Sequence, residues 1–335
     1  MFGGSSVIIK SLKLSASVSS YLVWPWYNFR YVKHKIMNVW TRLHSEYNRD
    51  RPRFALRATV VLLAISLMIL KRTFWTPDTL LIMVIIIGVV FGKAREFIVR
   101  FVPFLGMLVV YDSMRGIADD LNKNVHFTEM IDFDRWLWLG QLPTSWFQTW
   151  MWHGHVQWYD FYFYFLYMMH FLIPLIVGLL LWKYRPKLYW PFVWALVGIS
   201  FAAFITYIAF PAAPPWMAKE LGYIAEPLHR ISSDVWWAMG VQSFSQVYSN
   251  LSPNAVAAVP SLHSAYPLIA TLFIVKAFGL RRTWWLFIYP LSMWWGVVYL
   301  GEHYIFDVLA AILYVIVGIW LVRLGFRRWR SRHET

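Results

Sequence analysis

The chain has 335 residues, of which 59% are hydrophobic, 20% aromatic and only 14% charged. In soluble domains roughly a quarter of the residues are charged. This composition therefore excludes an ordinary soluble protein and indicates an all-α, polytopic transmembrane bundle. The net charge of +14 does not indicate a nucleic-acid partner, since Lys and Arg concentrate at the ends and in short loops between apolar runs. The absence of cysteine excludes disulfides and thiolate metal sites.

Residues 1–54 precede the first apolar run and lack the basic start, apolar core and cleavage site of a secretory signal. We expect a retained, basic cytoplasmic segment. It is either partly amphipathic, with Trp24, Trp26 and Tyr27 at the membrane interface, or a loosely ordered tail. Residues 55–335 are expected to form the transmembrane domain.

Eight apolar runs follow, each near the ~20 residues that a helical span needs. Charges at Arg95 and Arg100 shorten or interrupt the second and third runs. Residues 115–158 are aromatic and polar by turns, which is typical of helices in the headgroup region. The longest polar connection covers residues 211–263. The eight runs cover residues 55–71, 78–93, 97–114, 159–182, 189–210, 264–280, 283–301 and 304–324.

The distribution of charge predicts the orientation of these runs. With eight spans, both termini lie on one side, which then carries 20 Lys and Arg against six on the other. This bias predicts that both termini are cytoplasmic. The same alternation brings the ends of runs three, five and seven, and the starts of runs six and eight, to the extracytoplasmic or lumenal face. One functional site is expected there.

The first polar cluster at that face is Pro260-Ser261-Leu262-His263, which opens run six. Proline suits a first helical turn, Ser261 can cap it, and the free N–H groups of such a turn attract an anion. A capping or interfacial role is the alternative for a lone histidine such as His263.

The second cluster lies between runs seven and eight and includes His303 and Asp307, four residues apart. A helix starting near His303 places both on one face. The carboxylate there would hold the imidazole in one tautomer and raise its basicity. A structural ion pair is the alternative, but a carboxylate inside a span favours function. Glu302 has three interpretations: it pairs with a cation, it forms a hydrogen bond with a substrate hydroxyl, or it is a solvated loop residue. The solvated loop residue is favoured.

Other polar residues have simpler interpretations. Asp160 and His170 lie within run four, where they line a cavity or, as we favour, form helix–helix hydrogen bonds. A metal site is one interpretation of three histidines, but an interfacial aromatic loop is favoured because their spacing suits ligands poorly. Those histidines are His126, His153 and His155.

Several motifs occur together in a fixed order: F-P-A-A-P-P-W at 210–216, P-S-L-H at 260–263 and G-E-H-Y-I-F-D at 301–307. With Y-D-S-M-R-G at 111–116 and Y-M-M-H at 167–170, they resemble the membrane branch of the type-2 phosphatidic acid phosphatase superfamily. The similarity is closest to the branch of fungal inositol phosphorylceramide synthases and their bacterial relatives. It covers about residues 100–322 and implies a six-helix catalytic core.

The resemblance implies a reaction through a phosphohistidine. His303 would be the nucleophile, Asp307 its orienting partner, and His263 the acid and base for the leaving and entering oxygens. No metal and no cofactor is implied. The substrate would be a lipid phosphoester, and the acceptor a lipid or polyol alcohol.

Two departures from the family pattern concern the phosphate-binding cations. In the family, an arginine usually lies six residues before the nucleophilic histidine, but this chain has Val297 there. The family's first motif, a lysine followed seven residues later by Arg-Pro, is also absent. Arg115, Lys219 and Arg230 are the candidate replacements, and pairing with Asp112, Asp119 or Asp120 is the alternative for Arg115. The expected substrate or phosphate contacts are Arg115, Lys219, Tyr111, Ser261, Leu262 and His170.

The leading hypothesis is therefore a membrane phosphotransferase that moves a phosphoinositol-type head group. A lipid phosphate or polyprenyl diphosphate phosphatase is the alternative within the same chemistry. A transporter would spread polar residues through the depth of several runs, whereas here most of them lie at one face and His170 is the clearest exception. A non-catalytic, lipid-binding protein is the third class. The sequence leaves the oligomeric state open.

Overall fold

The computed structural model describes residues 94–115, 121–240 and 254–333, together with five isolated positions before residue 94. The chain divides into two units, Met1–Leu62 and Leu63–Thr335, and nearly all described residues belong to the second. Segment 1–54 and the predicted runs 55–71 and 78–93 lie outside the described residues, apart from those isolated positions.

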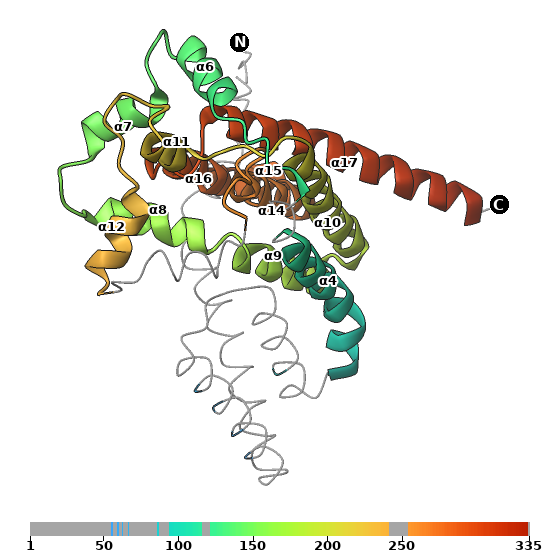
Figure 1. Cartoon of the computed structure of the whole chain (residues 1–335). Helices are drawn as coiled ribbons and strands as arrows, with labels where there is room; N and C mark the ends of the chain where they lie inside the picture. Colours follow the sequence, from blue (N-terminus) through green and yellow to red (C-terminus); the bar gives the residue numbers. More distant parts are fainter. Residues whose placement is uncertain are drawn as a thin grey trace, which may run out of the picture. The chain divides into compact units, whose positions relative to one another are not determined.

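The described part of the second unit is built from helices (Figure 1). Three of them, α10, α14 and α17, pack against one another, while α4 and α9 pack on α10 and α16 joins α14 to α8. The helices are α4 (Ala94–Arg115), α6 (Thr128–Leu137), α7 (Pro143–Met151), α8 (Trp158–Met168), α9 (Leu172–Tyr184), α10 (Pro186–Ala209), α11 (Pro215–Glu220), α12 (Ile231–Ala238), α14 (Leu262–Phe278), α15 (Leu280–Thr283), the 3₁₀ helix η1 (Trp284–Phe287), α16 (Ile288–Tyr299) and α17 (Ile305–His333).

Two described helices are long and apolar enough to cross a membrane by themselves. They are α10 and the segment Ile305–Trp329 of α17. The pair α8 and α9 qualifies as a third span if it is taken as one unit bent by 56°. Within α4, Ile98–Tyr111 forms a shorter apolar helix, and α14 is another. The all-α membrane fold is thus confirmed, with helices in each of the predicted runs three to eight.

Run four differs from its prediction, because it is broken rather than continuous. Helix α8 ends at Met168, and α9 starts at Leu172 with Pro174 near its beginning. Proline lacks the N–H that a continuing helix would need but fits a first turn. The break therefore falls at residues 169–171, which include His170.

Prolines also define the ends of α10, as predicted for the stretch at 210–216. Helix α10 begins at Pro186, where a missing N–H costs nothing, and ends at Ala209. The chain after it is extended: Ala212 N donates to the carbonyl of Val256 at 2.8 Å, and Ala213 N to that of His126 at 3.0 Å. This segment ties three distant parts of the chain together beside the first turn of α14.

Close packing joins α10 to α17 at a glycine. A Cβ added to Gly318 would lie 2.6 Å from Cγ1 of Ile199, so only glycine permits this approach of the two helices. The contact lies midway along α17 and fixes the helix that carries Asp307 at its first turn.

Candidate active site

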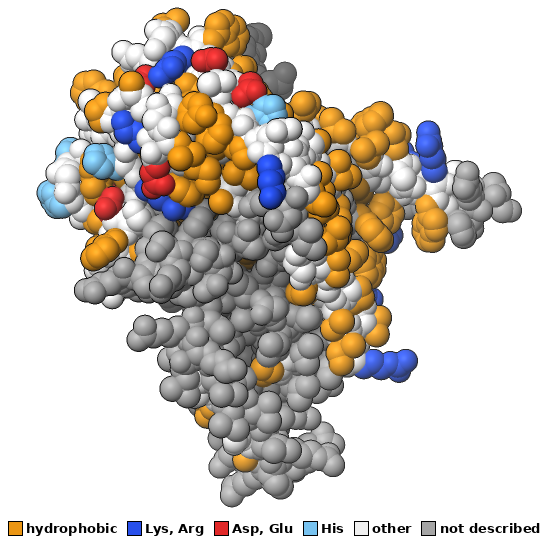
Figure 2. Space-filling view, in the orientation of Figure 1, with side chains coloured by type: hydrophobic (Ala, Val, Ile, Leu, Met, Phe, Trp, Pro, Cys, Tyr) orange, Lys and Arg blue, Asp and Glu red, His pale blue; other side chains and the backbone are white. Residues whose placement is uncertain are grey.

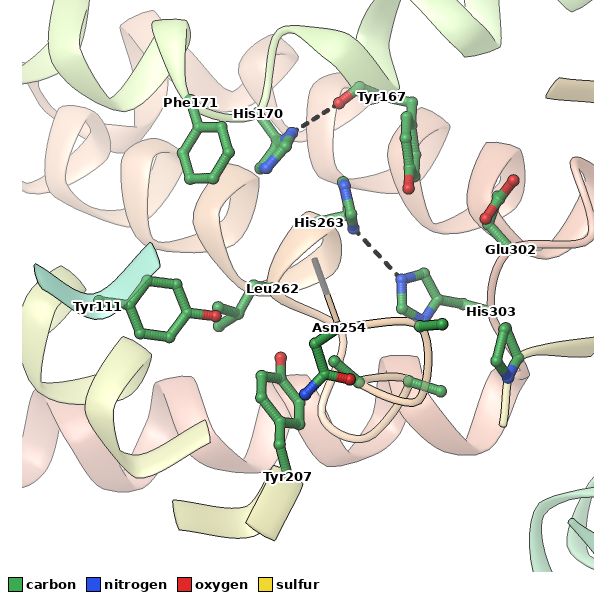
Figure 3. Close-up of a pocket in the computed structure, with 14 residues that line it drawn as sticks. Tyr111, Tyr167, His170, Phe171, Tyr207, Asn254, Leu262, His263, Glu302 and His303 are labelled. Carbon is green, nitrogen blue, oxygen red and sulfur yellow. Dashed lines mark hydrogen bonds between the residues drawn. The ribbon is translucent and has the colours of Figure 1, made fainter. Parts of the chain in front are cut away.

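A pocket lies where the first turn of α14 and the loop before α17 meet the break between α8 and α9 (Figure 3). Its polar wall is formed by three histidines, a glutamate and tyrosines from five parts of the chain. The residues that line it are Tyr111, Tyr167, His170, Phe171, Tyr207, Pro214, Asn254, Ala255, Ala257, Ala258, Leu262, His263, Glu302 and His303.

Two imidazoles and a carboxylate form a continuous chain at this pocket. Nδ1 of His263 lies 3.3 Å from Nε2 of His303, and Nδ1 of His303 lies 3.1 Å from Oδ2 of Asp307. The side chain of Asp307 is fully buried. Because an ionised carboxylate only accepts, His303 donates from Nδ1, and the lone pair of its Nε2 faces Nδ1 of His263 at the pocket.

The local fold of each helix start explains this arrangement. Ser261 caps α14, and its hydroxyl accepts a hydrogen bond from Ser264 N at 3.2 Å, which places His263 in the first turn. Tyr304 N donates to Oδ2 of Asp307 at 2.9 Å, so the same carboxylate caps α17 and holds His303. The two starts are joined where Ser261 N donates to the backbone carbonyl of Asp307 at 3.2 Å.

The ring of His263 is fixed on its other side by aromatic groups. It stacks on Tyr167 with 3.9 Å between the ring centroids and an angle of 11° between the planes. The ring of His170 lies 4.1 Å away, and its Nδ1 donates to the carbonyl of Tyr167 at 2.8 Å. A protonated His263 would be stabilised over the face of Tyr167.

The sequence-based argument for Glu302 as a solvated loop residue is wrong. Glu302 is only 3% exposed and forms an ion pair with Arg230, whose Nε lies 3.0 Å from Oε1. Ser232 donates a further hydrogen bond to Glu302, and the guanidinium of Arg230 lies over the ring of Trp216 at 3.7 Å. Solvation fails because the loop before α17 turns inward, so the carboxylate needs a cation as partner.

A buried carboxylate that sequence reasoning did not single out completes the start of α17. Asp134, on α6, accepts hydrogen bonds from Ile305 N and Phe306 N, both at 2.9 Å. Burial, reinforced by the charge of Asp307, raises the pKa of Asp134 to about 7 despite these donors. Its position beside Asp132 in a polar, aromatic stretch gave no signal for this role, because its partners lie 171 and 172 residues away.

The other residues predicted for the site fall into three groups. Leu262, Tyr111 and His170 line the pocket, whereas Ser261 does not line it and is the cap of α14, next in sequence to Leu262. Lys219 is absent from the lining, and its Nζ donates to the carbonyls of Ile224 and Ala225. The side chain of Arg115 lies outside what the structure describes, and the same holds for Asp112.

His170 no longer stands out as a polar residue at mid-depth of a span. The break after α8 brings it to the pocket, where its ring lies 4.1 Å from the ring of His263. Asp160, by contrast, forms the helix–helix hydrogen bond that was favoured for it, accepting from the hydroxyl of Tyr299 at 2.7 Å.

The remaining histidines lie elsewhere. His126 pairs with Glu129 at 2.5 Å, and His155 contacts Gln157 and the carbonyl of His153. Val297, at the position of the missing arginine, is buried in α16, and its carbonyl accepts from His303 N at 3.1 Å. Tyr207 was not anticipated: its hydroxyl donates to the carbonyl of Pro260 at 2.9 Å and supports the turn before His263.

Three curated relatives share similarity with this chain. Phosphoinositol dihydroceramide synthase of Bacteroides thetaiotaomicron is 30% identical over 169 residues, which is 48% of this chain and 54% of the relative. The catalytic subunit of inositol phosphorylceramide synthase of Schizosaccharomyces pombe is 28% identical over 162 residues, 44% of this chain and 36% of the relative. Inositol phosphorylceramide synthase of Candida albicans is 28% identical over 153 residues, which is 42% of this chain and 31% of the relative.

The chain thus spans about half the length of the bacterial relative and about a third of the fungal ones. No solved structure matches it. The PAP2 superfamily matches residues 128–321, a range that contains His263, His303 and Asp307 together with Asp134 and Glu302. Since this match covers more than half of the chain, the protein belongs to the PAP2 superfamily.

Proposed function

We propose that this protein is an integral membrane phosphotransferase that moves a phosphoinositol-type head group from a lipid donor to a lipid or polyol alcohol. The observation that carries the proposal is the hydrogen-bonded chain from His263 through His303 to Asp307 at the wall of one pocket. The names of the curated relatives support inositol phosphate transfer as the class of reaction.

In the first step, Nε2 of His303 attacks the phosphorus of the donor. A bond forms between nitrogen and phosphorus, and the bond from phosphorus to the lipid oxygen breaks. The leaving oxygen takes a proton from protonated His263, whose Nδ1 faces the same space at 3.3 Å from Nε2 of His303. Asp307 keeps His303 in the nucleophilic tautomer and stabilises the charge that develops on it.

In the second step, the now neutral His263 removes the proton of an incoming alcohol. The alcohol oxygen attacks phosphorus, and the bond from phosphorus to His303 breaks, so both histidines return to their starting protonation states. Water in place of the alcohol would give hydrolysis. We assign two groups to stabilise the negative charge of the phosphoryl group: the free N–H groups at the start of α14 and the cation of Arg230. Arg230 lies beside the pocket residue Glu302. This mechanism uses no metal.

The experiment that tests this function uses purified protein in detergent, with phosphatidylinositol labelled in its phosphate and either dihydroceramide or inositol as acceptor. Mass spectrometry should detect the transferred head group with the wild-type protein and none with His303→Asn. An acid-labile label should accumulate on His303 when the acceptor is omitted. His155→Asn, a substitution outside the pocket, is the matched control and should keep full transfer.

Three results would contradict parts of the proposal. Release of free phosphate or free inositol phosphate with no transfer product would make the protein a hydrolase. Turnover by a folded His303→Asn protein would remove that residue from its role. Binding of lipid without any turnover or label in the wild type would favour the non-catalytic class.

We also propose that both termini are cytoplasmic and that the pocket opens at the extracytoplasmic or lumenal face. The charge bias of the sequence supports this orientation.

A further inference from the structure

A second hollow lies at the end of the helix bundle opposite to the catalytic pocket. It is a groove of about 850 Å³ between α10, α14 and α17. Phe273 and Ile319 form a buried apolar floor, and the exposed side chains of Ile316 and Trp320 form one wall. At a rise of ~1.5 Å per residue, Lys276 lies about 20 Å along α14 from His263. The groove is therefore separate from the site of the proposed reaction.

Four cationic side chains surround one end of this groove: Lys187 of α10, Lys276 of α14, and Arg323 and Arg327 of α17. All four residues are exposed. The acidic residue that these three helices contain is Asp307, which is buried at their other end. The groove thus combines a strongly positive rim with an apolar body.

The surface over α17 is likewise divided into an apolar part and a cationic part. Figure 2 shows hydrophobic side chains along this helix, with Lys and Arg side chains toward its C-terminal end. Trp320 and Trp329 are both exposed there, and tryptophan is favoured where lipid tails meet head groups. The cations of the groove therefore lie at the depth where a lipid phosphate would be expected.

These features restrict the class of ligand. A free phosphate would use the rim and leave the apolar floor unoccupied. The chain's own segment 1–54 carries nine Lys and Arg against two Asp and Glu, so its net charge has the same sign as that of the rim. A molecule with an anionic head and long apolar chains satisfies both parts of the groove, and basic pockets between membrane helices bind such lipids.

We propose that this groove binds one anionic phospholipid of the leaflet opposite to the catalytic pocket. Its phosphate lies among Lys187, Lys276, Arg323 and Arg327, and its acyl chains run along Phe273, Ile316 and Ile319. Because the lipid bridges α10, α14 and α17, it stabilises the packing of the three helices on which the first turns with His263 and Asp307 are built.

The test uses the full chain in a non-ionic detergent, with dioctanoyl-phosphatidylglycerol as the probe and intrinsic tryptophan fluorescence as the measure of Tm. Phosphatidylglycerol should raise Tm in a saturable manner. Dioctanoyl-phosphatidylcholine and inorganic phosphate at the same concentrations should not. An equal rise with inorganic phosphate would overturn the proposal, and so would the absence of any rise with phosphatidylglycerol.

A pair of charge-matched variants locates the site. Replacement of Lys187, Lys276, Arg323 and Arg327 by Gln should weaken the apparent affinity at least about tenfold, because each cation near a lipid head group contributes to binding. The matched control replaces Lys183, Arg281, Arg282 and Arg328 by Gln. These four residues are exposed and lie outside the groove, and their replacement removes the same total charge. The control should bind within about twofold of the wild type. Equal weakening by both variants would refute a specific site.

Two further measurements do not depend on the charge variants. Ile316→Trp keeps every cation but fills the groove at an exposed position, and it should also weaken binding. A phosphatidylglycerol with a photoreactive group in its acyl chain should label the wild-type protein at 187–191, 272–276 or 316–327. Label confined to other segments would contradict the assignment.

Discussion

Nδ1 of His263 lies 3.3 Å from Nε2 of His303, although 40 residues separate the two positions in the sequence. The rings belong to the first turn of α14 and to the loop before α17, and the chain joins these starts through Ser261 N and the carbonyl of Asp307. A phosphoryl group bound in the pocket beside both rings would face a nucleophile, Nε2 of His303, and a proton donor, Nδ1 of His263. This relationship generates the first prediction.

Asp307→Asn should keep the fold but lower turnover by a factor of about 10³ to 10⁴, because a neutral amide no longer stabilises the positive charge that develops on the ring of His303. The amide oxygen can still accept from Tyr304 N, so the cap of α17 survives. The measurement is kcat for head-group transfer, together with KM. A loss confined to KM would show that Asp307 acts in binding rather than in orienting His303.

The ion pair of Arg230 and Glu302 should behave as one unit. Either Arg230→Met or Glu302→Gln leaves the partner buried without its counter-charge, and each should lower the free energy of unfolding by about 3 kcal/mol or more. The free energy of unfolding of the double variant should fall by much less than the sum of the two single losses. Thermal unfolding in detergent measures all three proteins.

The same double variant separates stability from chemistry. If Arg230 carries phosphoryl charge, the folded double variant should still lose transfer activity. Full activity in the double variant would limit the pair to a structural role.

Asp134 should make stability depend on pH. Its ordinary pKa is 3.8 and its pKa in the folded protein is about 7, so the folded state keeps a proton that the unfolded chain has released over this interval. The free energy of unfolding should therefore fall as pH rises from about 4 to about 7, by an amount on the order of 4 kcal/mol. Asp134→Asn should remove this part of the slope.

The control for that measurement is Asp132→Asn, an exposed residue of the same helix, which should keep the wild-type slope. The quantity to plot is the difference in unfolding free energy between wild type and each variant at every pH. A flat difference for Asp134→Asn, or a difference of opposite sign, would mean that Ile305 N and Phe306 N outweigh burial and keep Asp134 charged.

Gly318 and Gly325 offer a matched pair of positions on α17. A Cβ at Gly318 would meet Ile199 at 2.6 Å, whereas a Cβ at Gly325 meets nothing within 4 Å. Gly318→Val should therefore lower stability by about 1 to 3 kcal/mol relative to Gly325→Val, because the crowded position forces α10 and α17 apart. Unfolding in detergent gives the comparison. Equal effects at the two sites would argue against the tight contact of these helices.

The absence of cysteine makes the proposed orientation directly testable. A single cysteine at Glu220 or at Arg282, both exposed, places a label near the pocket end or near the opposite end of the bundle. In intact cells that carry the protein in the plasma membrane, an impermeant maleimide added outside should label the Glu220 position. The Arg282 position should react only after the membrane is opened. The reverse pattern would invert the topology.

Local chemistry allowed much of the fold to be predicted from the sequence. The prolines after Ala209 stop α10 and the capping serine at 261 starts α14, because each rule acts within a turn or two. The predicted contact of His303 with Asp307 also forms, but α17 starts at Ile305, so His303 lies in the loop before the helix and not on its face. The alternation of runs brought His263 and His303 to one end of the bundle, as the structure has them.

Only the tertiary structure decided which distant groups meet. Asp134 reaches the start of α17 across more than 170 residues, and Arg230 reaches Glu302 across 72. The pattern of the sequence reports which groups prefer burial, but not which partner satisfies each one after burial. That choice depends on how whole helices pack, and here the packing turned a presumed loop glutamate into a buried ion pair and brought His170 to the wall of the pocket.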